Sequence, residues 1–336
     1  MSSASSSPQA SSPRLRAQST STKRAEAEET ESGYASASSS SSTTGGSGSD
    51  VDSDSDSSSS PGGLPQITLA KPHLRYLNEQ MEQMTAVDRL RFALRLFPRL
   101  YQTTALGLTG LVTMDMLARL SAEDPSLPAV EAIFLDTLHH FPETYALLAR
   151  ARARYPAIKL HVYGPDGAAT PAEFESRYGA ALYDSAAELY DWVAKVEPQQ
   201  RAYAELGVAA VLTGRRRSQG GERDRLPVLE VDEERGIVKV NPLLDWSFAQ
   251  VRAYVAEHDV PYNELLDRGY KSVGDWHSTS PVGAGEDERA GRWKGQQKTE
   301  CGIHNKKSRY AQFLAQQQQQ QQQQQEKDGH LISVSS

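Results

Sequence analysis

The segment TECGIHNKKSRY, residues 299–310, contains Cys301, the single cysteine among 336 residues. A free cysteine is most often a small buried apolar residue, but the neighbours of Cys301 are mostly charged. Positive charges nearby lower the pKa of a thiol and increase its nucleophilic thiolate fraction, whereas a glutamate acts in the opposite direction. The segment therefore favours a reactive thiol, with the buried apolar residue as the alternative. The neighbours are Lys298, Glu300, His304, Lys306, Lys307 and Arg309.

Arginines gather in a second stretch, TGRRRSQGGERDR, residues 213–225, with five arginines within eleven positions. Five guanidinium groups on one face would repel one another unless an anion lay between them. Arginine also suits two-point contacts with phosphate or sulfate better than lysine does. The stretch therefore predicts a polyanion site. A single thiol combined with such a site suggests nucleophilic attack on a bound phosphate or sulfate ester.

Two further motifs follow predicted strands. In LGLTG, residues 106–110, the glycines can bring backbone N–H groups close to a phosphate at the start of a helix; a plain turn is the alternative. In LDTLHHF, residues 135–141, Asp136 precedes His139 and His140. The alternative to a ligand site is an aspartate cap followed by two solvated histidines. No third ligand lies at a recognised metal spacing, so we expect no metal site.

The elements that position these motifs alternate between strand and helix. This alternation predicts right-handed crossovers, a parallel sheet and a three-layer α/β architecture. Ligands bind such sheets beyond the carboxyl ends of the strands, where the motifs lie. The predicted strands are 101–106, 130–136, 159–164 and 208–214, and the predicted helices are 77–97, 111–120, 142–155, 171–178 and 199–206.

The sequence after this core changes in character. Residues 228–241 are typical of a hairpin with Gly236 in its turn, and the following helix begins with the capping-box pair Ser247 and Gln250. Residues 261–299 are rich in Gly, Asp and Lys and have few apolar repeats. A long irregular segment within a folded domain is usually functional or mobile.

Composition divides the chain into three parts. Residues 1–63 are dominated by Ser, Thr, Gly, Asp and Glu, which predicts a disordered tail. Residues 64–315 can form one folded domain, and residues 316–336 are a low-complexity tail that begins with glutamines. One cysteine excludes an internal disulfide or a four-thiolate metal site supplied by one chain.

Charge and hydropathy narrow the class of protein further. The net charge of −7 predicts neither a nucleic-acid nor a membrane partner. No apolar run approaches the length of a spanning helix, so we expect a soluble, intracellular protein. The first residues weakly resemble an organellar transit peptide, but they lack the apolar face of one.

The chain contains, in this order, the motifs LGLTG, LDTLHHF, TGRRRSQGGER, DRGYKSVGDWHST and AGRWKGQQKTECGIH. Together, these five motifs resemble those of phosphoadenylyl-sulfate reductases, the thioredoxin-dependent enzymes of sulfate assimilation, and most of all the fungal members. The resemblance implies an adenine-nucleotide α-hydrolase-like fold with a mobile C-terminal catalytic segment, residues 271–310. It also implies a cytoplasmic enzyme, commonly a homodimer, that reduces 3′-phosphoadenylyl sulfate (PAPS) through an S-sulfo-cysteine on Cys301 and uses thioredoxin in trans.

The resemblance also assigns residues to the site. Cys301 is the expected catalytic residue, and residues 104–110 are the expected phosphate loop. Ala105 departs from the family, which often has serine there, so a hydroxyl donor is lost. The expected substrate-binding residues are Thr104, Gly107, Gly110, Asp136, Arg216, Arg217, Gln219, Arg223, Tyr270, His277, Arg292, Lys298 and His304.

Cysteine content also bears on the substrate and on the alternatives. Relatives that use adenylyl sulfate generally hold an iron–sulfur cluster through four thiolates, which one cysteine cannot supply. We therefore expect the phosphorylated substrate and no bound cofactor. Two alternatives on the same fold are a noncatalytic adenine-nucleotide sensor and a nucleotidyl transferase such as an FAD synthetase, which would use Mg²⁺ and no thiol.

Overall fold

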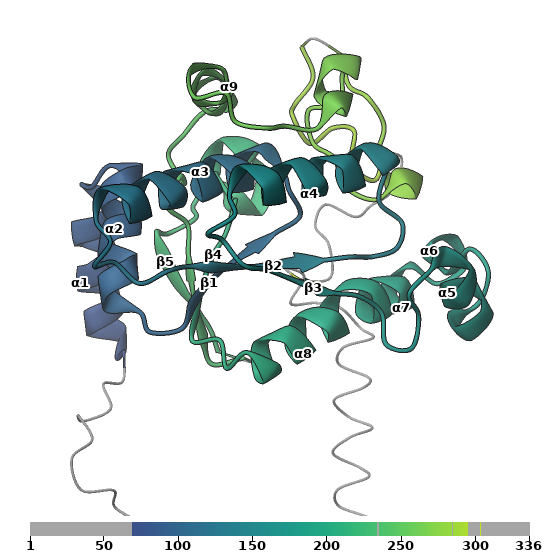
Figure 1. The fold of residues 1–336 in the computed structure, drawn as a ribbon, viewed down its shortest axis with the longest axis horizontal. Coiled ribbons are helices and arrows are strands. Elements are labelled where there is room, and N and C mark those ends of the chain that lie inside the picture. The colour runs from purple at the N-terminus through teal and green to yellow at the C-terminus, as the bar shows by residue number, and fades with distance from the viewer. Residues whose placement is uncertain (1–68, 234, 284, 295–302, 304–336) are drawn as a thin grey trace, which may run out of the picture. The chain divides into compact units, whose positions relative to one another are not determined.

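The computed structural model describes residues 69–294, apart from residues 234 and 284, and also Ile303. These residues form a six-stranded sheet in the order β3-β2-β1-β4-β6-β5 (Figure 1). Neighbouring strands are parallel except for β5 and β6, which pair antiparallel at one edge. The strands are β1 (Leu100–Thr104), β2 (Glu131–Leu135), β3 (Leu160–Tyr163), β4 (Ala210–Leu212), β5 (Leu229–Asp232) and β6 (Ile237–Val240).

Helices cover both faces of this sheet, which confirms the three-layer α/β prediction. In Figure 1, α3, α4 and α9 lie above the sheet and α7 and α8 lie below it, while α1 and α2 lie at the β5 side. The bounds are α1 (Lys71–Glu82), α2 (Ala86–Leu96), α3 (Leu108–Glu123), α4 (Pro142–Arg154), α5 (Pro171–Tyr178), α6 (Leu182–Ser185), α7 (Ala187–Asp191), α8 (Glu197–Glu205) and α9 (Phe248–Glu257).

The two faces of the sheet bury separate apolar clusters. Leu212 and Phe134 point to the upper face, where they join the cluster of α2, α3 and α9. Ile133 and Val211 point to the lower face, where they pack with Tyr203 of α8. Since successive strand residues face opposite sides, both layers are needed to bury these strands, as in other parallel sheets.

The helical stretch expected over residues 77–97 is two helices, α1 and α2. The helical spacing is interrupted at Thr85, whose side chain accepts a hydrogen bond from the backbone N–H of Asp88 (3.2 Å). This is an N-cap, and it begins a new helix at Ala86. The apolar periodicity alone did not reveal the break.

The chain between β3 and β4 contains more helix than predicted. Besides α5 and α8, the structure shows α6, α7 and a π-helical turn, Trp192–Val196, that joins α7 to α8. The predicted hairpin is confirmed as β5 and β6, with Gly236 at φ +65° in its turn. The predicted capping box of α9 is also confirmed, since Ser247 and Gln250 make both reciprocal hydrogen bonds.

The segment after α9 is irregular, as expected, and its described part contains short 3₁₀ turns, Glu264–Arg268 and Trp276–Ser278, and two isolated β-bridges. The predicted tails, residues 1–63 and 316–336, lie outside the described residues. No helix among the described residues has the length and apolar character needed to cross a membrane.

Candidate functional site

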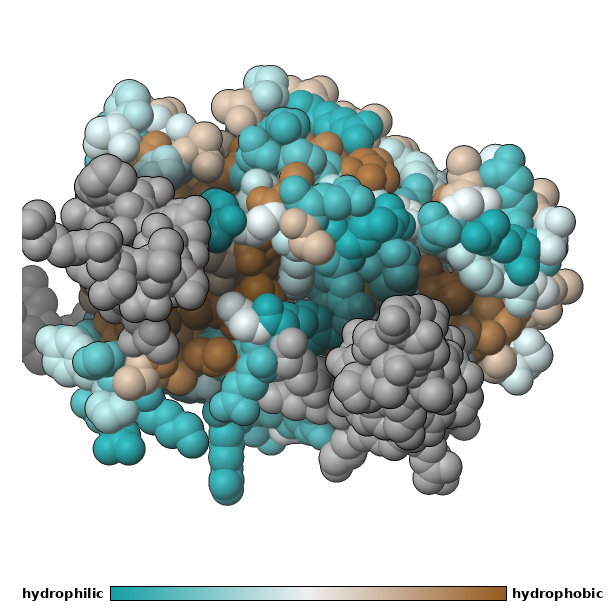
Figure 2. All heavy atoms as spheres, turned by 90° about the horizontal axis from the view of Figure 1, so that it is seen from below, coloured by the Kyte–Doolittle hydropathy of each residue, from teal (hydrophilic) through white to brown (hydrophobic). Residues whose placement is uncertain are grey.

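A cavity of about 270 Å³ lies at the carboxyl ends of β1, β2 and β4. Open parallel sheets bind their ligands at this edge. The loops after these strands line one side of the cavity, and residues 271–275 and 288–293 line another. Seen from below, the molecule shows a recessed area where apolar surface borders hydrophilic side chains (Figure 2). The cavity therefore lies at the edge of the sheet where the sequence predicted a ligand site.

The loops that follow β1, β2 and β4 begin in the same way. In each, a side-chain oxygen at the end of the strand accepts a hydrogen bond from the backbone N–H two residues later, which turns the chain sharply. Two of the donors, Leu106 and Leu138, have φ values of 54° and 63°, in the left-handed region. The acceptor and donor pairs are Thr104 with Leu106 (2.9 Å), Asp136 with Leu138 (2.9 Å) and Thr213 with Arg215 (3.3 Å).

Gly107 and Gly110, both predicted to approach a phosphate, have different surroundings. Gly107 is the N-cap of α3, and a Cβ placed on it would meet no atom within 4 Å. The space beside it belongs to the cavity. Gly110 lies inside α3, where a Cβ would come within 2.9 Å of the Thr104 hydroxyl oxygen. Packing of α3 against β1 therefore requires the second glycine, whereas the first leaves room for a ligand.

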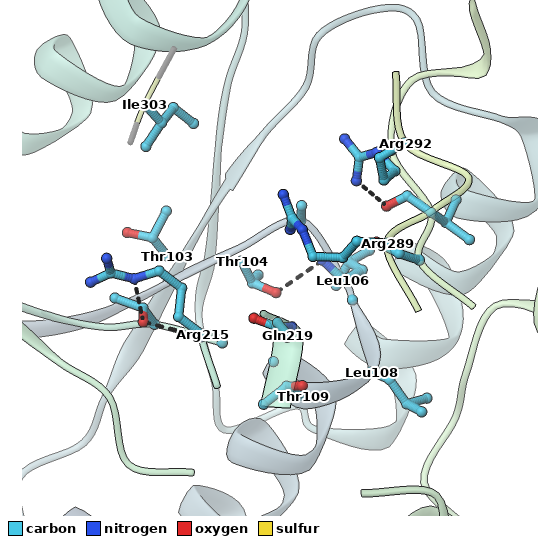
Figure 3. Close-up of a pocket in the computed structure, with 18 of the residues that line it drawn as sticks. Thr103, Thr104, Leu106, Leu108, Thr109, Arg215, Gln219, Arg289, Arg292 and Ile303 are labelled. Atoms are coloured by element: carbon cyan, nitrogen blue, oxygen red, sulfur yellow. Dashed lines mark hydrogen bonds between the residues drawn. The ribbon is translucent and has the colours of Figure 1, made fainter. Parts of the chain in front are cut away.

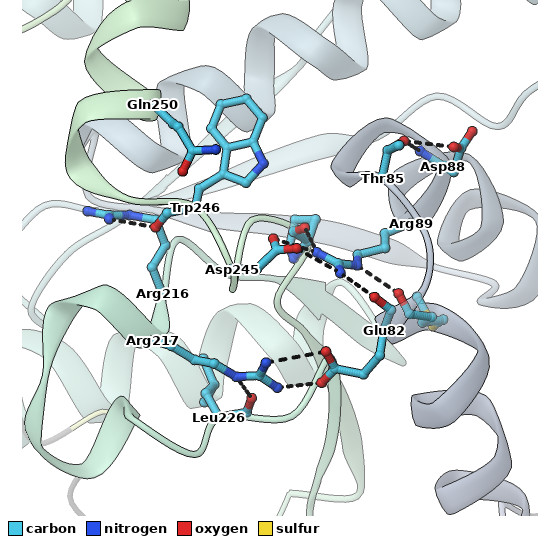
Figure 4. A network of polar contacts seen from close by, with 12 residues as sticks. Glu82, Thr85, Asp88, Arg89, Arg216, Arg217, Leu226, Asp245, Trp246 and Gln250 are labelled. Atoms are coloured by element: carbon cyan, nitrogen blue, oxygen red, sulfur yellow. Dashed lines mark hydrogen bonds and ion pairs between the residues drawn. The ribbon is translucent and has the colours of Figure 1, made fainter.

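The arginine loop, residues 213–225, sends side chains in two directions. Arg216 and Arg223 line the cavity, as do Arg215 and Gln219 (Figure 3). Arg217 does not: its guanidinium pairs with Glu82 at the end of α1, and its Nε donates to the Leu226 carbonyl (2.8 Å) (Figure 4). Only part of the predicted arginine set therefore faces the cavity.

Most of the motif that follows β2, residues 135–141, stabilises the local fold and does not line the cavity. The carboxylate of Asp136 accepts from the Leu138 N–H and from the hydroxyl of Tyr145 (2.8 Å), and it does not line the cavity. The histidines are buried rather than solvated: His139 is 3% exposed and His140 is 8% exposed. His139 packs among aromatic rings, whereas His140 lines the cavity. Within the described residues, no group of three metal-ligating side chains could hold an ion.

Lys195 and Asp275 form a buried ion pair at the cavity, with Nζ and Oδ2 2.8 Å apart. The π-helical turn brings Lys195 to this position, and such turns recur at functional sites. Burial raises the pKa of the Asp275 carboxyl, but the charges of Lys195 and His140 and hydrogen bonds from Lys195 and Thr137 outweigh burial. Together they hold that pKa well below its usual range, so Asp275 is an anion.

The C-terminal segment supplies two arginines to the cavity, Arg289 and Arg292. The Arg292 guanidinium lies over the Trp293 ring at 4.6 Å and donates to the Val273 carbonyl (3.4 Å). A Cβ on Gly274 would overlap this guanidinium, so the arginine packs directly on the backbone there.

The remaining predicted residues lie in three places. Tyr270 packs on Phe141, and His277 stacks on Tyr183 with ring centroids 4.1 Å apart; neither lines the cavity. Cys301, Lys298 and His304 lie outside the described residues. Sequence reasoning missed Lys195, Lys239, Asp275, Glu288 and Arg289, which line the cavity.

The cavity at the carboxyl edge of this α/β fold gathers lysine and arginine side chains, whose charge suits a small polyanion. Residues 99–281 match the family of the phosphoadenosine phosphosulfate reductase domain. The chain is 60% identical over 251 residues to the phosphoadenosine phosphosulfate reductase of Emericella nidulans, covering 75% of this chain and 81% of that protein. It is 52% identical over 254 residues to the Saccharomyces cerevisiae enzyme of that name, covering 74% and 96%.

A solved structure gives the same result. The phosphoadenylyl-sulfate reductase of Candida auris, determined as a phosphate complex, matches with a TM-score of 0.58 and 50% identity, covering 64% of this chain and all of that chain. The chain therefore belongs to the phosphoadenosine phosphosulfate reductase family.

Proposed function

We propose that this protein is an oxidoreductase of sulfate assimilation that reduces PAPS to sulfite and adenosine 3′,5′-bisphosphate, with thioredoxin as the electron donor. The observation that supports it most is the convergence of Lys195, Arg223, Arg289 and Arg292 on one cavity. Their positive charge suits a nucleotide that carries phosphate and sulfate groups. The proposal that this nucleotide is PAPS, and that it is reduced, follows from membership of the phosphoadenosine phosphosulfate reductase family.

The first step is attack by the Cys301 thiolate on the sulfur of PAPS. A bond forms between Sγ and that sulfur, and the sulfur–oxygen bond to the 5′-phosphate breaks. Adenosine 3′,5′-bisphosphate leaves with the electron pair, and the enzyme retains an S-sulfo-cysteine. Cationic side chains beside the leaving phosphate stabilise its developing charge.

The second step transfers two electrons from thioredoxin. One of its thiolates attacks Sγ of Cys301 and expels sulfite, which leaves a mixed disulfide between the two proteins. The second thioredoxin thiol then attacks the thioredoxin sulfur of this disulfide, releasing the Cys301 thiolate and oxidised thioredoxin. One cysteine in the reductase is sufficient for this cycle.

Ile303 supports a position of Cys301 at this cavity. Ile303 lines the cavity and packs on the apolar cluster of the lower face, beside Tyr203 and Val211. Two residues of chain span at most about 7 Å. Cys301 precedes Ile303 by two residues, so the location of Ile303 favours a thiol within reach of a bound nucleotide.

The binding roles divide along the loops. The open space beside Gly107 at the start of α3 suits a phosphate, and Arg223 and Gln219 of the arginine loop line the same cavity. Lys195 and Arg292 approach from other segments. The binding roles of Lys298 and His304 remain predictions. The same holds for three residues that do not line the cavity, Asp136, Tyr270 and His277. These three would have to act on the nucleotide indirectly or after a change in side-chain position.

Several finer assignments belong to the same proposal. A chain with one cysteine cannot supply the four thiolates of an iron–sulfur cluster, which favours PAPS over adenylyl sulfate and a mechanism without a bound cofactor. We further propose a cytoplasmic homodimer whose catalytic domain is residues 64–315. Removal of residues 1–63 should then leave turnover intact.

Intact-mass measurement tests the covalent mechanism. The reduced protein is mixed with PAPS in the absence of thioredoxin, and we expect a gain of about 80 Da, one sulfonate, on the enzyme. The gain should disappear in Cys301→Ser and on addition of reduced thioredoxin. An unmodified mass with intact nucleotide binding would contradict the mechanism and favour a sensor on this fold. AMP transfer from ATP with Mg²⁺ by Cys301→Ser would favour a nucleotidyl transferase.

A further inference from the structure

The Arg216 guanidinium is saturated by acceptors of the protein itself. Arginine has five N–H donors, and Arg216, only 1% exposed, meets five acceptors. Nε donates to the Thr109 hydroxyl (2.9 Å), and Nη1 donates to the Ser218 hydroxyl (2.6 Å) and the Trp246 carbonyl (3.1 Å). Nη2 donates to both carboxylate oxygens of Glu288 (2.7 and 2.6 Å). All three guanidinium nitrogens of Arg216 are therefore bound to acceptors of the protein, and a substrate oxyanion would have to displace one of them.

Glu288 is the partner that links this arginine to another part of the chain. It is 8% exposed and lies directly before Arg289, whose N–H donates to the Asp287 carboxylate (2.8 Å). Arg289 and Arg292 both line the cavity. The position of the Glu288 carboxylate therefore sets where this pair of arginines enters the site.

The segment that bears these arginines is fastened on both sides of the cavity. At its start, Asp275 receives hydrogen bonds or ion pairs from Thr137 and Lys195 on the β2 side. The segment then folds back on itself, since the N–H of Ser280 donates to the Gly291 carbonyl (2.9 Å). Near its end, Glu288 binds Arg216 on the β4 side. Two buried carboxylates, Asp275 and Glu288, therefore fasten the two parts of this segment that line the cavity.

We propose that Arg216 and Glu288 form a clasp that positions Arg289 and Arg292 for the nucleotide, so that Arg216 is a positioning residue and not a ligand of the substrate. A buried guanidinium–carboxylate pair is a strong, charge-assisted contact, and here Nη2 of Arg216 lies against both oxygens of Glu288. The proposal rests on the proposed function for the identity of the bound anion. The competing arrangement has Glu288 as a placeholder that leaves when a phosphate or sulfate group reaches Arg216.

The two arrangements predict opposite signs for one substitution, Glu288→Gln. The amide keeps the shape of the side chain but loses the charge and one acceptor. If the clasp positions Arg289 and Arg292, the Kd of full-length protein for adenosine 3′,5′-bisphosphate, measured by calorimetry, should rise about tenfold or more. A placeholder would instead give a lower Kd, because the competing anion has been removed.

A second readout follows the segment rather than the ligand. Trypsin should cleave after Arg289 and Arg292 faster in Glu288→Gln than in the wild type, both without nucleotide, since the segment is released on the β4 side. Glu286→Gln is the matched control: Glu286 is exposed, and its carboxylate accepts a hydrogen bond from the nearby Gly283 N–H (2.7 Å). It should leave both the Kd and the cleavage rate unchanged.

Arg216→Lys and Glu288→Gln together form a double-mutant cycle that tests whether the two side chains act as one unit. As members of one clasp, Arg216→Lys and Glu288→Gln should raise the Kd by similar factors, and the double variant should be no worse than either single variant. An unchanged or lower Kd in Glu288→Gln, or an unchanged cleavage rate, would overturn the clasp. Wild-type protein that fails to bind the nucleotide would instead contradict the proposed function, and the cleavage rates would then judge the clasp alone.

Discussion

Arg216 and Arg217 are neighbours in the sequence, yet they belong to opposite sides of the arginine loop (Figure 4). Arg216 is buried at the cavity and binds Glu288 of the C-terminal segment. The side chain of Arg217 is 35% exposed and binds Glu82 of α1. On the side of the loop that faces the cavity, Arg216 thus joins segments that line the site. On the side that faces α1, Arg217 joins the loop to this helix.

Arg89 shows that complete pairing of an arginine does not by itself indicate function. It is 0% exposed, and like Arg216 it donates to five acceptors. These are the carbonyls of Met81 (2.8 Å), Glu82 (3.1 Å) and Pro242 (3.1 Å) and the two carboxylate oxygens of Asp245 (2.8 and 3.1 Å). The two arginines differ in where their partners lie. The acceptors of Arg89 belong to the end of α1 and to the turn 242–245. The partner of Arg216, Glu288, directly precedes a residue that lines the cavity, Arg289.

The largest effect that would test this comparison is the loss of stability in Arg89→Ala. Removing the guanidinium leaves three carbonyls and a carboxylate without their buried donor, at a cost of about 3–5 kcal/mol in the free energy of unfolding. Denaturant titration measures this loss. The Kd for adenosine 3′,5′-bisphosphate should stay unchanged wherever the variant is folded.

Arg91→Ala is the control for that experiment. Arg91 lies on the same helix, is partly exposed and pairs with Asp88 at 2.9 Å. Exposed pairs of this kind contribute about 0–1 kcal/mol. A loss in Arg89→Ala as small as that in Arg91→Ala would show that the α1 side is not held by its buried arginine.

On the cavity side, Asp275→Asn should lower the free energy of unfolding by about 3 kcal/mol at neutral pH. This loss is smaller than that expected for Arg89→Ala, because Lys195 keeps its contact with Asp191 (3.1 Å). The pH dependence identifies the cause. The pKa of Asp275 in the folded protein lies below its unfolded value of about 4. Its ionised form therefore stabilises the fold fully above about pH 4, and the contribution falls as the pH drops toward the folded pKa.

Chemical denaturation of wild type and Asp275→Asn at a series of pH values measures this contribution. The difference in unfolding free energy should be constant between pH 5 and 8, within about 0.5 kcal/mol, and should narrow progressively below about pH 4. A difference that is independent of pH down to pH 3 would mean that the loss comes from packing around the amide and not from the carboxylate charge.

The sequence predicted the order of strands and helices well because both patterns are local. Alternation of β-prone runs with helical periodicity identified β1, β2, β3 and β4, and turn chemistry identified the hairpin with Gly236. The break at Thr85 was missed because the apolar spacing on either side of it is helical. The π-helical turn at Lys195 was missed for a related reason, since one inserted residue leaves no signal in composition.

The candidate site was predicted in its location but not in the direction of its side chains. A run of arginines shows that an anion or several carboxylates must lie near, but it does not show which guanidinium finds an internal partner. Glu82 and Glu288 are 135 and 72 residues from the arginines that they bind. Only the fold brings such pairs together, so the role of Arg217 could not be separated from that of Arg216.

Arg217→Ala should give the smallest effect and tests the comparison most directly. The pair with Glu82 is partly exposed, so we expect a loss of about 0–1 kcal/mol in unfolding free energy, plus little change in KM for PAPS, since Arg217 does not line the cavity. Steady-state kinetics with thioredoxin at saturation measures KM, and Glu82→Ala should reproduce the same small loss of stability. If Arg217→Ala raises KM tenfold while Glu82→Ala does not, Arg217 must turn from α1 toward the nucleotide during binding, and the two sides of the arginine loop would act on one ligand.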